Sequence, residues 1–599
     1  MGTHVNAVSD QPANGYVVYY APMYVDTVPN RGSRPAVLLR ESLRQGSRVI
    51  KRTLANISDW PAQKVETLRR LLRDETLVGP TDVFTTTRTL PHGHVEAILG
   101  LIRKLGVDRL ISSTPSRERD LIVALVTARI LFPSSKLATS RLFSSCTLAQ
   151  ELGLGDETDV DELYDALDWL LERQGRIEKK LARRHLGNSS RALYDLSSSF
   201  YYGRHCPLAA LGHNRDGKRD TLIIEYGLLT DGQGRPVAIS VYRGNRSDST
   251  TVPDQVAKLQ EEFGLKEVVL VGDRGMLTRT QLQTLREYPG LGWISALKSR
   301  EIRTLMDKGP LQLSLLDERG LAEIASPDFP GERLVACFNP LLAEERRRTR
   351  RELLEETDKR LGKIVAEAAR RTQTPLTDAE LGLKAGRVVN HFKVAKHFRL
   401  TIRDGHLSFE HDETSILRES EMDGIYVIRT NQSPDVLSAD DAVRTYKSLA
   451  QVEQAFRCLK QTDLQIRPIR HRTEDHVRAH IFLCMLAYYV DWHLRRALTP
   501  LLFEDGELDE DRWTRHPVAK AEPSRPAATK KTQRLTPDGL PVMDLQTLLK
   551  ELASRSRNTF RMKADDPTRA ATFTQITEPT PLQARAFELL ETYPVTANS

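Results

Sequence analysis

The spacing of hydrophobic and polar positions changes several times along the chain, and each change predicts a different kind of structure. Residues 16–57 alternate apolar and polar side chains around the turn sequences PNRGS and RQGS, which predicts a small antiparallel sheet. Residues 62–74 have the spacing of a helix. From about 92 to 188 the pattern is helical throughout, and its clearest segment, VDELYDALDWLLERQGRIEKKLARRHL, is acidic at its start and basic at its end, as the helix dipole favours.

A different pattern begins near residue 190. Runs rich in β-branched and aromatic residues, divided by Gly, Asn and Asp, predict three sequential antiparallel strands. Helix and strand patterns then alternate, and the run EVVLVGD has the continuous apolar character of a strand buried on both faces. The predicted order is therefore βββαβαβ, with strands at 191–203, 220–231, 235–245, 267–273 and 292–297 and helices at 249–264 and 278–287.

Residues 300–420 interrupt this order with strand-like segments around a long charged helix. A strand pattern returns at 423–431, and YKSLAQVEQAFRCLK (446–460) predicts an amphipathic helix. Residues 505–540 are polar and rich in Pro, Lys and Thr, which favours a linker. We therefore divide the chain into a small sheet and helix (1–80), a helical region (81–188), the first part of an α/β core (189–300), an insertion (301–420), the second part of the core (421–500), and a polar linker with a C-terminal segment (501–599).

Composition narrows the class of protein. A chain of 599 residues is too long for one core, and 40% hydrophobic with 28% charged residues is typical of a globular protein. No run approaches the ~18 apolar residues of a membrane span, and the five cysteines are scattered without a CxxC pair. We therefore expect a cytoplasmic protein without a membrane partner. The net charge of +7 leans towards a polyanionic partner, although it is mild for a chain of this length.

Three carboxylates lie where these elements would bring chemistry together. Asp195 is in the first strand of the core, and Asp273 ends the buried strand, where ligands of such sheets collect. Glu453 lies at the centre of the helix over 446–460. Each has an ordinary alternative: a turn bond for Asp195, a strand end capped by Arg274 for Asp273, and a surface salt bridge for Glu453. Together, two strand aspartates and a helix glutamate suit a pair of Mg²⁺ ions ~3.5–4 Å apart, which cleave phosphodiesters.

The segments YDLSSSFYYG, GNRSDSTT, LVGDRGMLT and YKSLAQVEQAFRCLK resemble those of a bacterial insertion-sequence transposase of the DDE type, most similar to the insertion-sequence-four group. The resemblance covers about residues 190–500. It implies a ribonuclease-H-like catalytic core, with a mixed five-stranded sheet and helices, interrupted by an insertion subdomain. It also implies that Asp195, Asp273 and Glu453 are catalytic and bind two Mg²⁺ ions, for which Mn²⁺ substitutes.

That group carries a Tyr-Arg-Glu-Lys signature. Tyr446 and Lys460 match its tyrosine and lysine, but Leu449 stands at the arginine position. Arg457, one helical turn after Glu453, is a candidate to supply the missing cation. Tyr446, Glu453 and Lys460 recur every seven residues and are therefore expected on nearly one face of a single helix.

The resemblance further implies a partner and a reaction. The enzyme would bind the element's terminal inverted repeats through residues 1–188, nick the element ends, and join the freed 3′-hydroxyls to target DNA. Double-stranded DNA is then the partner, and a homodimer on DNA is expected, at the nucleoid of a bacterial cytoplasm. The candidate DNA-binding residues are Arg467, Arg470, His471 and Arg472 of RPIRHR, and Arg346, Arg347 and Arg348 of RRRTRR, whose alternative is a helix face paired to nearby glutamates.

Two further hypotheses stay open. The chain could be a transposase-derived DNA-binding protein that has lost catalysis, or a two-metal ribonuclease-H-like nuclease that cuts DNA without joining it. Two patterns are set aside: GHNRDGKR (212–219) lacks the final hydroxyl residue of a P-loop and precedes a strand, and His476 and His480 lack the glutamate of HExxH.

Overall fold

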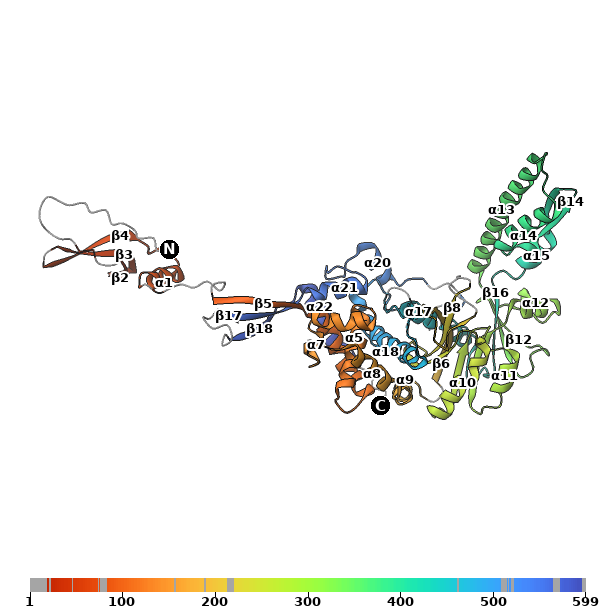
Figure 1. Cartoon of the computed structure of the whole chain (residues 1–599), viewed down its shortest axis with the longest axis horizontal. Helices are drawn as coiled ribbons and strands as arrows, with labels where there is room; N and C mark the ends of the chain where they lie inside the picture. The colour runs from red at the N-terminus through yellow and green to blue at the C-terminus, as the bar shows by residue number, and fades with distance from the viewer. Residues whose placement is uncertain are drawn as a thin grey trace. The chain divides into compact units, whose positions relative to one another are not determined.

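The computed structural model describes residues 19–20, 23–45, 47–73, 75, 83–155, 158–187, 190–212, 220–460, 463–507, 514, 516–518, 522–563 and 571–594. Apart from Gly212, the segment GHNRDGKR lies outside these residues. The chain forms two compact units, residues 1–89 with 558–575 and residues 90–557 with 576–599 (Figure 1).

The first unit contains the antiparallel sheet predicted near the N-terminus. Strand β3 (Ser33–Gln45) pairs with β2 (Tyr24–Asn30) and the short β1 (Tyr19–Tyr20), and on its other side with β4 (Arg48–Asn56). Helix α1 (Ala62–Leu71) follows the sheet in the sequence and contacts β2.

The C-terminal segment, which follows the predicted linker and for which the sequence predicts no element, contributes regular structure. Strand β5 (Phe84–Pro91) pairs with β17 (Ser556–Met562), which pairs with β18 (Thr572–Ile576). Helices α21 (Leu545–Ala553) and α22 (Pro581–Thr592) contact α3 (Gly93–Leu105) of the second unit. Burial of Leu548 and Leu552 explains the difference, because these side chains complete the core around α3.

The five core strands that the sequence predicts are present in the second unit. The first three pair antiparallel in the order β9–β8–β6, and β10 and β11 then continue parallel to β6. Their bounds are β6 (Ser190–Phe200), β8 (Leu222–Asp231), β9 (Pro236–Arg243), β10 (Val268–Gly272) and β11 (Leu291–Ala296).

The sheet is wider than predicted, because among the described residues it has nine strands rather than five. Strand β16 (Ile425–Thr430) pairs antiparallel with β11, and β13 (Arg333–Phe338) and β12 (Leu321–Ile324) extend that edge. The two-residue strand β7 (Ala210–Leu211) pairs with β8 at the other side. The first strands of the predicted insertion therefore belong to the core sheet.

The rest of the insertion is a small subdomain with its own apolar cluster, which includes Leu361, Leu381 and Phe398. In Figure 1 its elements lie together beyond β16 and α12 (Ser299–Asp307). They are α13 (Pro340–Arg370), α14 (Asp378–His391), β14 (Phe398–Arg403), β15 (His406–His411) and α15 (Glu413–Ser420).

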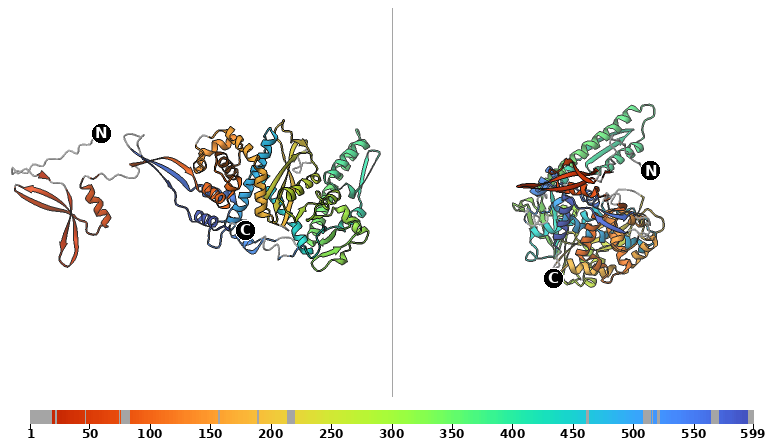
Figure 2. Two further views of the ribbon diagram at one scale, coloured as in Figure 1. Left: turned by 90° about the horizontal axis from the view of Figure 1, so that it is seen from below. Right: turned by 90° about the vertical axis from the view of Figure 1, so that its left-hand side faces the viewer.

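The helical region shares one core with the part of the chain that forms the nine-stranded sheet. Helix α18 (Glu474–Leu498) contacts α5 (Arg117–Leu131), α8 (Val160–Leu171) and strand β9, and Figure 2 shows it between these helices and the sheet. Every residue of α5 from 121 to 130 is buried, so this helix has no free face for a DNA groove. The remaining long helix of the region is α9 (Gln174–His185).

No single helix in the described part of the chain is long and apolar enough to span a membrane. One pair, Arg117–Leu131 with Lys136–Ser145, meets the length and composition criteria only jointly, and it is bent by 94°.

A buried cationic cluster lies where the helical region meets α18. Lys136, at the start of α6 (Lys136–Leu142), is 3% exposed, and its Nζ lies 3.5 Å from Nδ1 of His480. Burial, helped by the nearby positive charge of Arg129, lowers the pKa of Lys136 to about 7. Burial and the same cations hold the pKa of His480 well below its usual range, so this histidine is neutral. Nε2 of His480 also donates to the backbone carbonyl of Ile466 over 3.0 Å, so its role is structural.

We expect the variant Lys136→Met to be more stable than the parent chain at pH 7, by on the order of 2 kcal/mol, because the lysine loses its hydration on folding. The unfolded chain binds more protons at this site between the folded pKa of about 7 and the usual 10.5, so the lysine makes stability rise with pH in that window. The advantage of the variant should therefore shrink between pH 7 and pH 9 in urea unfolding. The exposed Lys179→Met serves as control, and an advantage that is independent of pH would contradict this account.

Candidate functional site

Asp195 and Asp273 are brought together by the register of two parallel strands. Val271 of β10 pairs with Leu193 of β6, and Gly272 pairs with Tyr194. The next residues in this register are Asp273 and Asp195, and paired residues of neighbouring strands project to the same face of a sheet. Asp273 follows the last residue of β10 and is exposed, whereas Asp195 lies within β6 and is half-buried.

The face that carries Asp195 is covered by α17 (Leu449–Lys460), which contacts β6. Ser199, four residues after Asp195 and on the same face, lies 2.8 Å from the hydroxyl of Tyr226. The Tyr226 ring in turn packs on Phe456 of α17, with ring centres 5.8 Å apart. Glu453 is one helical turn before Phe456 and is exposed, so α17 presents a carboxylate on the side of the sheet that holds Asp195.

The segment 446–460 is not one helix, contrary to the prediction. Helix α16 (Ala439–Lys447) ends before Ser448, and α17 begins at Leu449. The hydroxyl of Ser448 donates to the carbonyl of Thr445 at 2.6 Å, which satisfies a carbonyl at the end of α16. Tyr446 therefore reaches the site from a separate helix, and the seven-residue spacing does not place it on one face with Glu453 and Lys460.

Tyr446 joins the aspartate pair directly. Its hydroxyl donates to Oδ1 of Asp273 at 3.2 Å. Burial and the negative charge of Asp273 raise the pKa of the Tyr446 phenol well above its usual range, Glu453 adds to this rise and Arg274 opposes it. The phenol therefore keeps its proton at neutral pH, and both Glu453 and Arg274 act electrostatically on the same hydroxyl.

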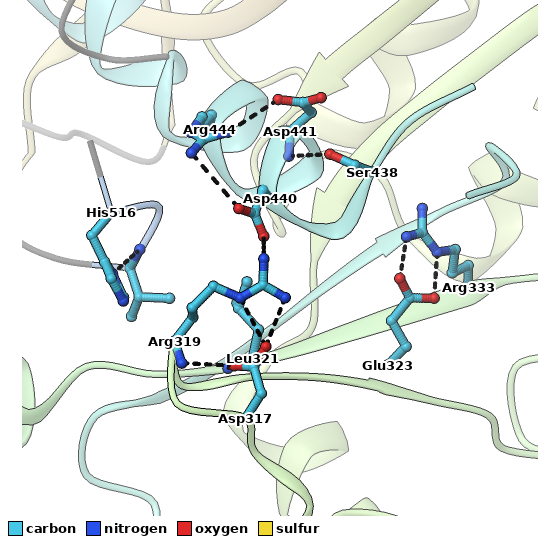
Figure 3. Close-up of polar contacts among 11 residues, drawn as sticks. Asp317, Arg319, Leu321, Glu323, Arg333, Ser438, Asp440, Asp441, Arg444 and His516 are labelled. Carbon is cyan, nitrogen blue, oxygen red and sulfur yellow. Dashed lines mark hydrogen bonds and ion pairs between the residues drawn. The ribbon is translucent and has the colours of Figure 1, made fainter. Parts of the chain in front are cut away.

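An ion-pair cluster fixes the start of α16 against the turn that leads into β12 (Figure 3). Arg319 of this turn lies 3.0 Å from Asp440 and 2.8 Å from Asp317. Ser438 caps the helix by accepting from the backbone N–H of Asp441. Because Tyr446 is two turns further along α16, these contacts position its hydroxyl over Asp273.

The other positions of the Tyr-Arg-Glu-Lys signature, and the candidate replacement cation Arg457, differ from one another in burial. Leu449 is buried in the core, so the position of the signature arginine is filled by a packing residue. Arg457 is exposed on α17. Lys460 is 9% exposed at the end of that helix, and its carbonyl accepts from Arg467 at 3.2 Å. Arg274, beside the Tyr446 hydroxyl, is thus a cation of this site that the signature does not predict.

A cleft of about 960 Å³ opens beside Asp273 and Tyr446. One wall belongs to the core sheet, at Arg274 and Ala296, and the opposite wall to the insertion. The insertion contributes both signs of charge, and several of these groups are paired: Arg350 contacts Asp423, and Lys396 lies 2.9 Å from Glu419. The cationic residues that line this wall are Arg346, Arg350, Lys393 and Lys396.

The residues of the two predicted basic segments differ in whether they line this cleft and in how exposed they are. Of Arg346, Arg347 and Arg348, only Arg346 lines it, whereas Arg348 lies 3.9 Å from Glu352 in an exposed pair along α13. In the loop before α18, Arg470 and Arg472 are exposed and Arg467 is half-buried. His471 packs edge-on to Tyr164, and burial lowers its pKa to about 3, so it is neutral and is not a cation for phosphate.

The donor chemistry at Asp195, Asp273 and Glu453 fits a hard cation such as Mg²⁺, because all three offer carboxylate oxygens. They do not form a closed ligand set in this arrangement: within the described residues, no three His, Cys, Asp or Glu side chains are placed to hold a metal ion together. The structure thus brings two aspartates into register, links one of them to Tyr446, and places Glu453 on the facing helix.

Residues 209–490 match the family model of the transposase DDE domain. This match begins after Asp195 and contains Asp273, Tyr446 and Glu453. No curated protein matches the sequence.

Among solved structures, the chain is similar to the piggyBac transposase in its synaptic complex with hairpin DNA. The identity is 10%, the TM-score is 0.32, and the alignment covers 77% of this chain and 82% of that one.

Proposed function

We propose that this protein is a DDE transposase of an insertion sequence, which cuts DNA at the ends of its element and joins the freed 3′-hydroxyls to target DNA. The observation that carries the proposal is the parallel register of β6 and β10, in which Tyr194 pairs with Gly272 directly before Asp195 and Asp273. A helix that bears Glu453 lies over β6, and residues 209–490 of the chain match the transposase DDE domain. A ribonuclease-H-like core is the fold that we assign to strands β9–β8–β6–β10–β11, since three antiparallel strands followed by two parallel ones have that topology.

In the proposed reaction, Asp195, Asp273 and Glu453 would hold two Mg²⁺ ions, or Mn²⁺ in their place. Such ions, when bound, polarise a phosphodiester and activate a water or 3′-hydroxyl for in-line attack. Tyr446 keeps its proton, and its hydroxyl donates a hydrogen bond to Oδ1 of Asp273, which would fix the orientation of that carboxylate.

The cleft beside Asp273 is the place that we propose for the DNA strand to be cut. Arg274 and Arg346 line it from opposite walls, and each would offer a charge-assisted hydrogen bond to phosphate oxygens. The exposed Arg470 and Arg472 would add backbone contacts. Because two element ends must be processed together, we expect a homodimer on DNA.

The function is tested by incubating the full chain with Mg²⁺ and duplex DNA taken from the regions that flank its coding sequence. Nicking at the element ends followed by joining to a plasmid would support the proposal. Nicking without joining would identify a nuclease instead. Binding without cleavage, in either Mg²⁺ or Mn²⁺, would indicate a transposase-derived DNA-binding protein and overturn the proposal.

We expect Tyr446→Phe to slow strand cleavage by about tenfold, because a hydrogen bond to a charged group contributes roughly 1.5 kcal/mol or more. The midpoint of thermal unfolding should change little, since the ring stays in place. Single-turnover cleavage measures the effect, and the half-buried Tyr288→Phe is the matched control. A variant as fast as the parent chain would show that this hydroxyl does not position Asp273.

A further inference from the structure

One carboxylate on the insertion wall of the cleft is met by three donors. Nζ of Lys396 donates to one oxygen of Glu419 over 2.9 Å, and Nε2 of His397 donates to the other oxygen. Nε of Arg350 lies 4.0 Å from that second oxygen. All four side chains line the cleft that opens beside Asp273. Converging donors of this kind bind phosphate oxygens as well as carboxylate oxygens.

The three donors belong to elements other than α15, which carries Glu419. Arg350 is in α13, and Lys396 and His397 are in the 3-10 turn Ala395–His397, which follows α14. The side chains of Arg350 and His397 are 11% and 2% exposed, whereas that of Glu419 is 33% exposed. The carboxylate therefore lies nearer to solvent than two of its three donors.

Glu419 is ionised at neutral pH. Burial would raise the pKa of its carboxyl group, but Lys396 and His397 lower this pKa below its usual value. Burial lowers the pKa of His397, and Glu419 opposes that effect. The neutral ring accepts at Nδ1 from the hydroxyl of Ser415 over 3.1 Å, which leaves the proton on Nε2. The His397 ring thus presents an N–H to whichever anion takes the place of Glu419.

Helix α15 is held mainly by polar contacts. None of its eight residues is buried, and Ile416 packs against the apolar cluster of the insertion while only partly buried. Ser415 and Glu419 contact the turn before β14, and Arg418 lies 3.1 Å from Asp307. A segment with so few buried contacts opens at a low cost in free energy. Departure of Glu419 therefore requires no rearrangement of the core.

Arg350 is shared between two carboxylates and is fully matched to neither. Its Nη2 donates to Oδ1 of Asp423, but its Nε is too far from Glu419 for a hydrogen bond. Oδ2 of Asp423 is buried and has no hydrogen-bond partner among the residues that the structure describes. Since a buried oxygen without a donor is unfavourable, this network is not fully satisfied in the free chain. A phosphate, which has more acceptor oxygens, would give Nε of Arg350 the partner that Glu419 does not.

We propose that Arg350, Lys396 and His397 form a phosphate subsite on the insertion wall of the cleft, which Glu419 occupies in the free protein and leaves when a phosphate binds. The exchange keeps each donor paired and returns the carboxylate to water, so its cost in free energy is small. That the phosphate belongs to a DNA strand rests on the proposed function; the competition between Glu419 and a phosphate does not.

Such a contact lowers the affinity of the free protein for its ligand. Only the molecules in which Glu419 has left the donors can bind a phosphate there, and the apparent dissociation constant rises by the inverse of their fraction. Glu419 is therefore an autoinhibitory contact. It disfavours polyanions that reach the cleft without a phosphate at this place.

The test compares Glu419→Gln with Glu413→Gln in the full chain. Both glutamates lie on α15 and pair with a histidine, but Glu413 is 3.9 Å from His411 and lies outside the residues that line the cleft. Binding to a duplex from the element end is measured by fluorescence anisotropy without divalent cations, at several salt concentrations. We expect Glu419→Gln to bind about fivefold more tightly than the parent chain, with a log K against log salt slope steeper by about 1. Glu413→Gln should bind like the parent chain.

The variant Lys396→Gln separates the subsite from the net charge. This lysine side chain is 57% exposed, so its replacement should leave the midpoint of thermal unfolding close to that of the parent chain. In the Lys396→Gln background, Glu419→Gln should bring little gain in affinity, because one of the donors that it would release is absent. Thermal unfolding of each variant checks that the fold is kept.

Hydrogen exchange of residues 413–420 gives a measurement on the parent chain itself. DNA binding should speed the exchange of these amides, because α15 loses the contacts of Glu419 and Ser415 with the turn. The same change with inorganic phosphate alone, at equal ionic strength, would support the subsite and assign it to free phosphate instead of a DNA strand.

Three outcomes would overturn the proposal. They are unchanged or weaker DNA binding by Glu419→Gln, an equal gain in Glu413→Gln or in the Lys396→Gln background, and unchanged or slower exchange of residues 413–420 in the complex. Cleavage separates this inference from the proposed function. Tighter binding by Glu419→Gln in a chain that does not cut DNA refutes only the function. Unchanged binding by Glu419→Gln, while Asp273→Asn loses cleavage, refutes only the subsite.

Discussion

Replacing Asp273 by asparagine is expected to reduce strand cleavage by at least ~10³-fold while DNA binding and thermal stability stay close to those of the parent chain. The amide keeps the shape of the side chain and its oxygen can still accept from Tyr446, but it removes the negative charge that a divalent cation requires. Asp273 is exposed, so the substitution leaves no uncompensated group in the core. Initial rates of Mg²⁺-dependent nicking measure the effect.

Asp195→Asn and Glu453→Gln should give losses of the same order, since the three carboxylates are proposed to act together. The exposed Asp307→Asn on α12 makes the same chemical change outside the site and should cleave at the parent rate. If Glu453→Gln alone kept full activity, Glu453 would be a surface residue of α17, and another acid would have to complete the trio.

Replacing Arg495 by methionine is expected to lower the free energy of unfolding by about 3–5 kcal/mol, because it leaves the buried carboxylate of Asp491 without its cationic partner. Nε of Arg495 lies 2.7 Å from Asp491, whose side chain is fully buried, and the other guanidinium nitrogens reach Asp463 at 3.1 Å and Glu504 at 2.7 Å. Burial raises the pKa of Asp491, and Arg495 opposes that rise. Urea unfolding followed by circular dichroism measures the loss.

Two further variants separate the buried charge from the loss of packing. Asp491→Asn added to Arg495→Met should recover part of the stability, because the carboxylate that lost its partner is then neutral. Arg585→Ala breaks an exposed pair with Glu588 and should leave the free energy of unfolding close to that of the parent chain. A double variant that is no more stable than Arg495→Met would show that the arginine contributes through its contacts rather than its charge. Since Sγ of Cys458 lies 3.4 Å from Asp491, the same network also ties α17, and hence Glu453, to α18.

The sequence predicts the inner part of the site because local patterns determine it. Apolar runs identify β6 and β10, and each aspartate has a place in or directly after one of these runs. The break at Ser448 is not predictable from periodicity, because the apolar spacing continues across it and a single hydroxyl bond to Thr445 ends α16. Pairing between segments far apart in the sequence is not visible in local patterns either. The sequence therefore predicts five strands for a sheet that β12, β13 and β16 also join, and it places β12 and β13 in the insertion.

The cations of the site are likewise predictable from the sequence only where they are close to the aspartates along the chain. Arg274 is next to Asp273 in the sequence, which makes it a predictable partner of that carboxylate. Arg350, Lys393 and Lys396 line the cleft only because the insertion folds back beside β16. Net charge over the whole chain also conceals its distribution, since residues 23–73 contain eleven Lys and Arg but four Asp and Glu, while all 599 residues together carry +7.

The parallel pairing of β6 with β10 has a consequence for insertions and deletions. The residues that set this register, such as Leu193 and Val271, are buried core residues, and side chains alternate between the two faces of a strand. Loss of one residue between 268 and 272 would either expose this core or turn Asp273 to the opposite face from Asp195. Loss of one residue between α10 (Val252–Ala257) and β10, near Gly264, would leave the buried core intact and would keep Asp273 on the same face as Asp195. Length variation among related chains should therefore be found in the connections and not within these two strands.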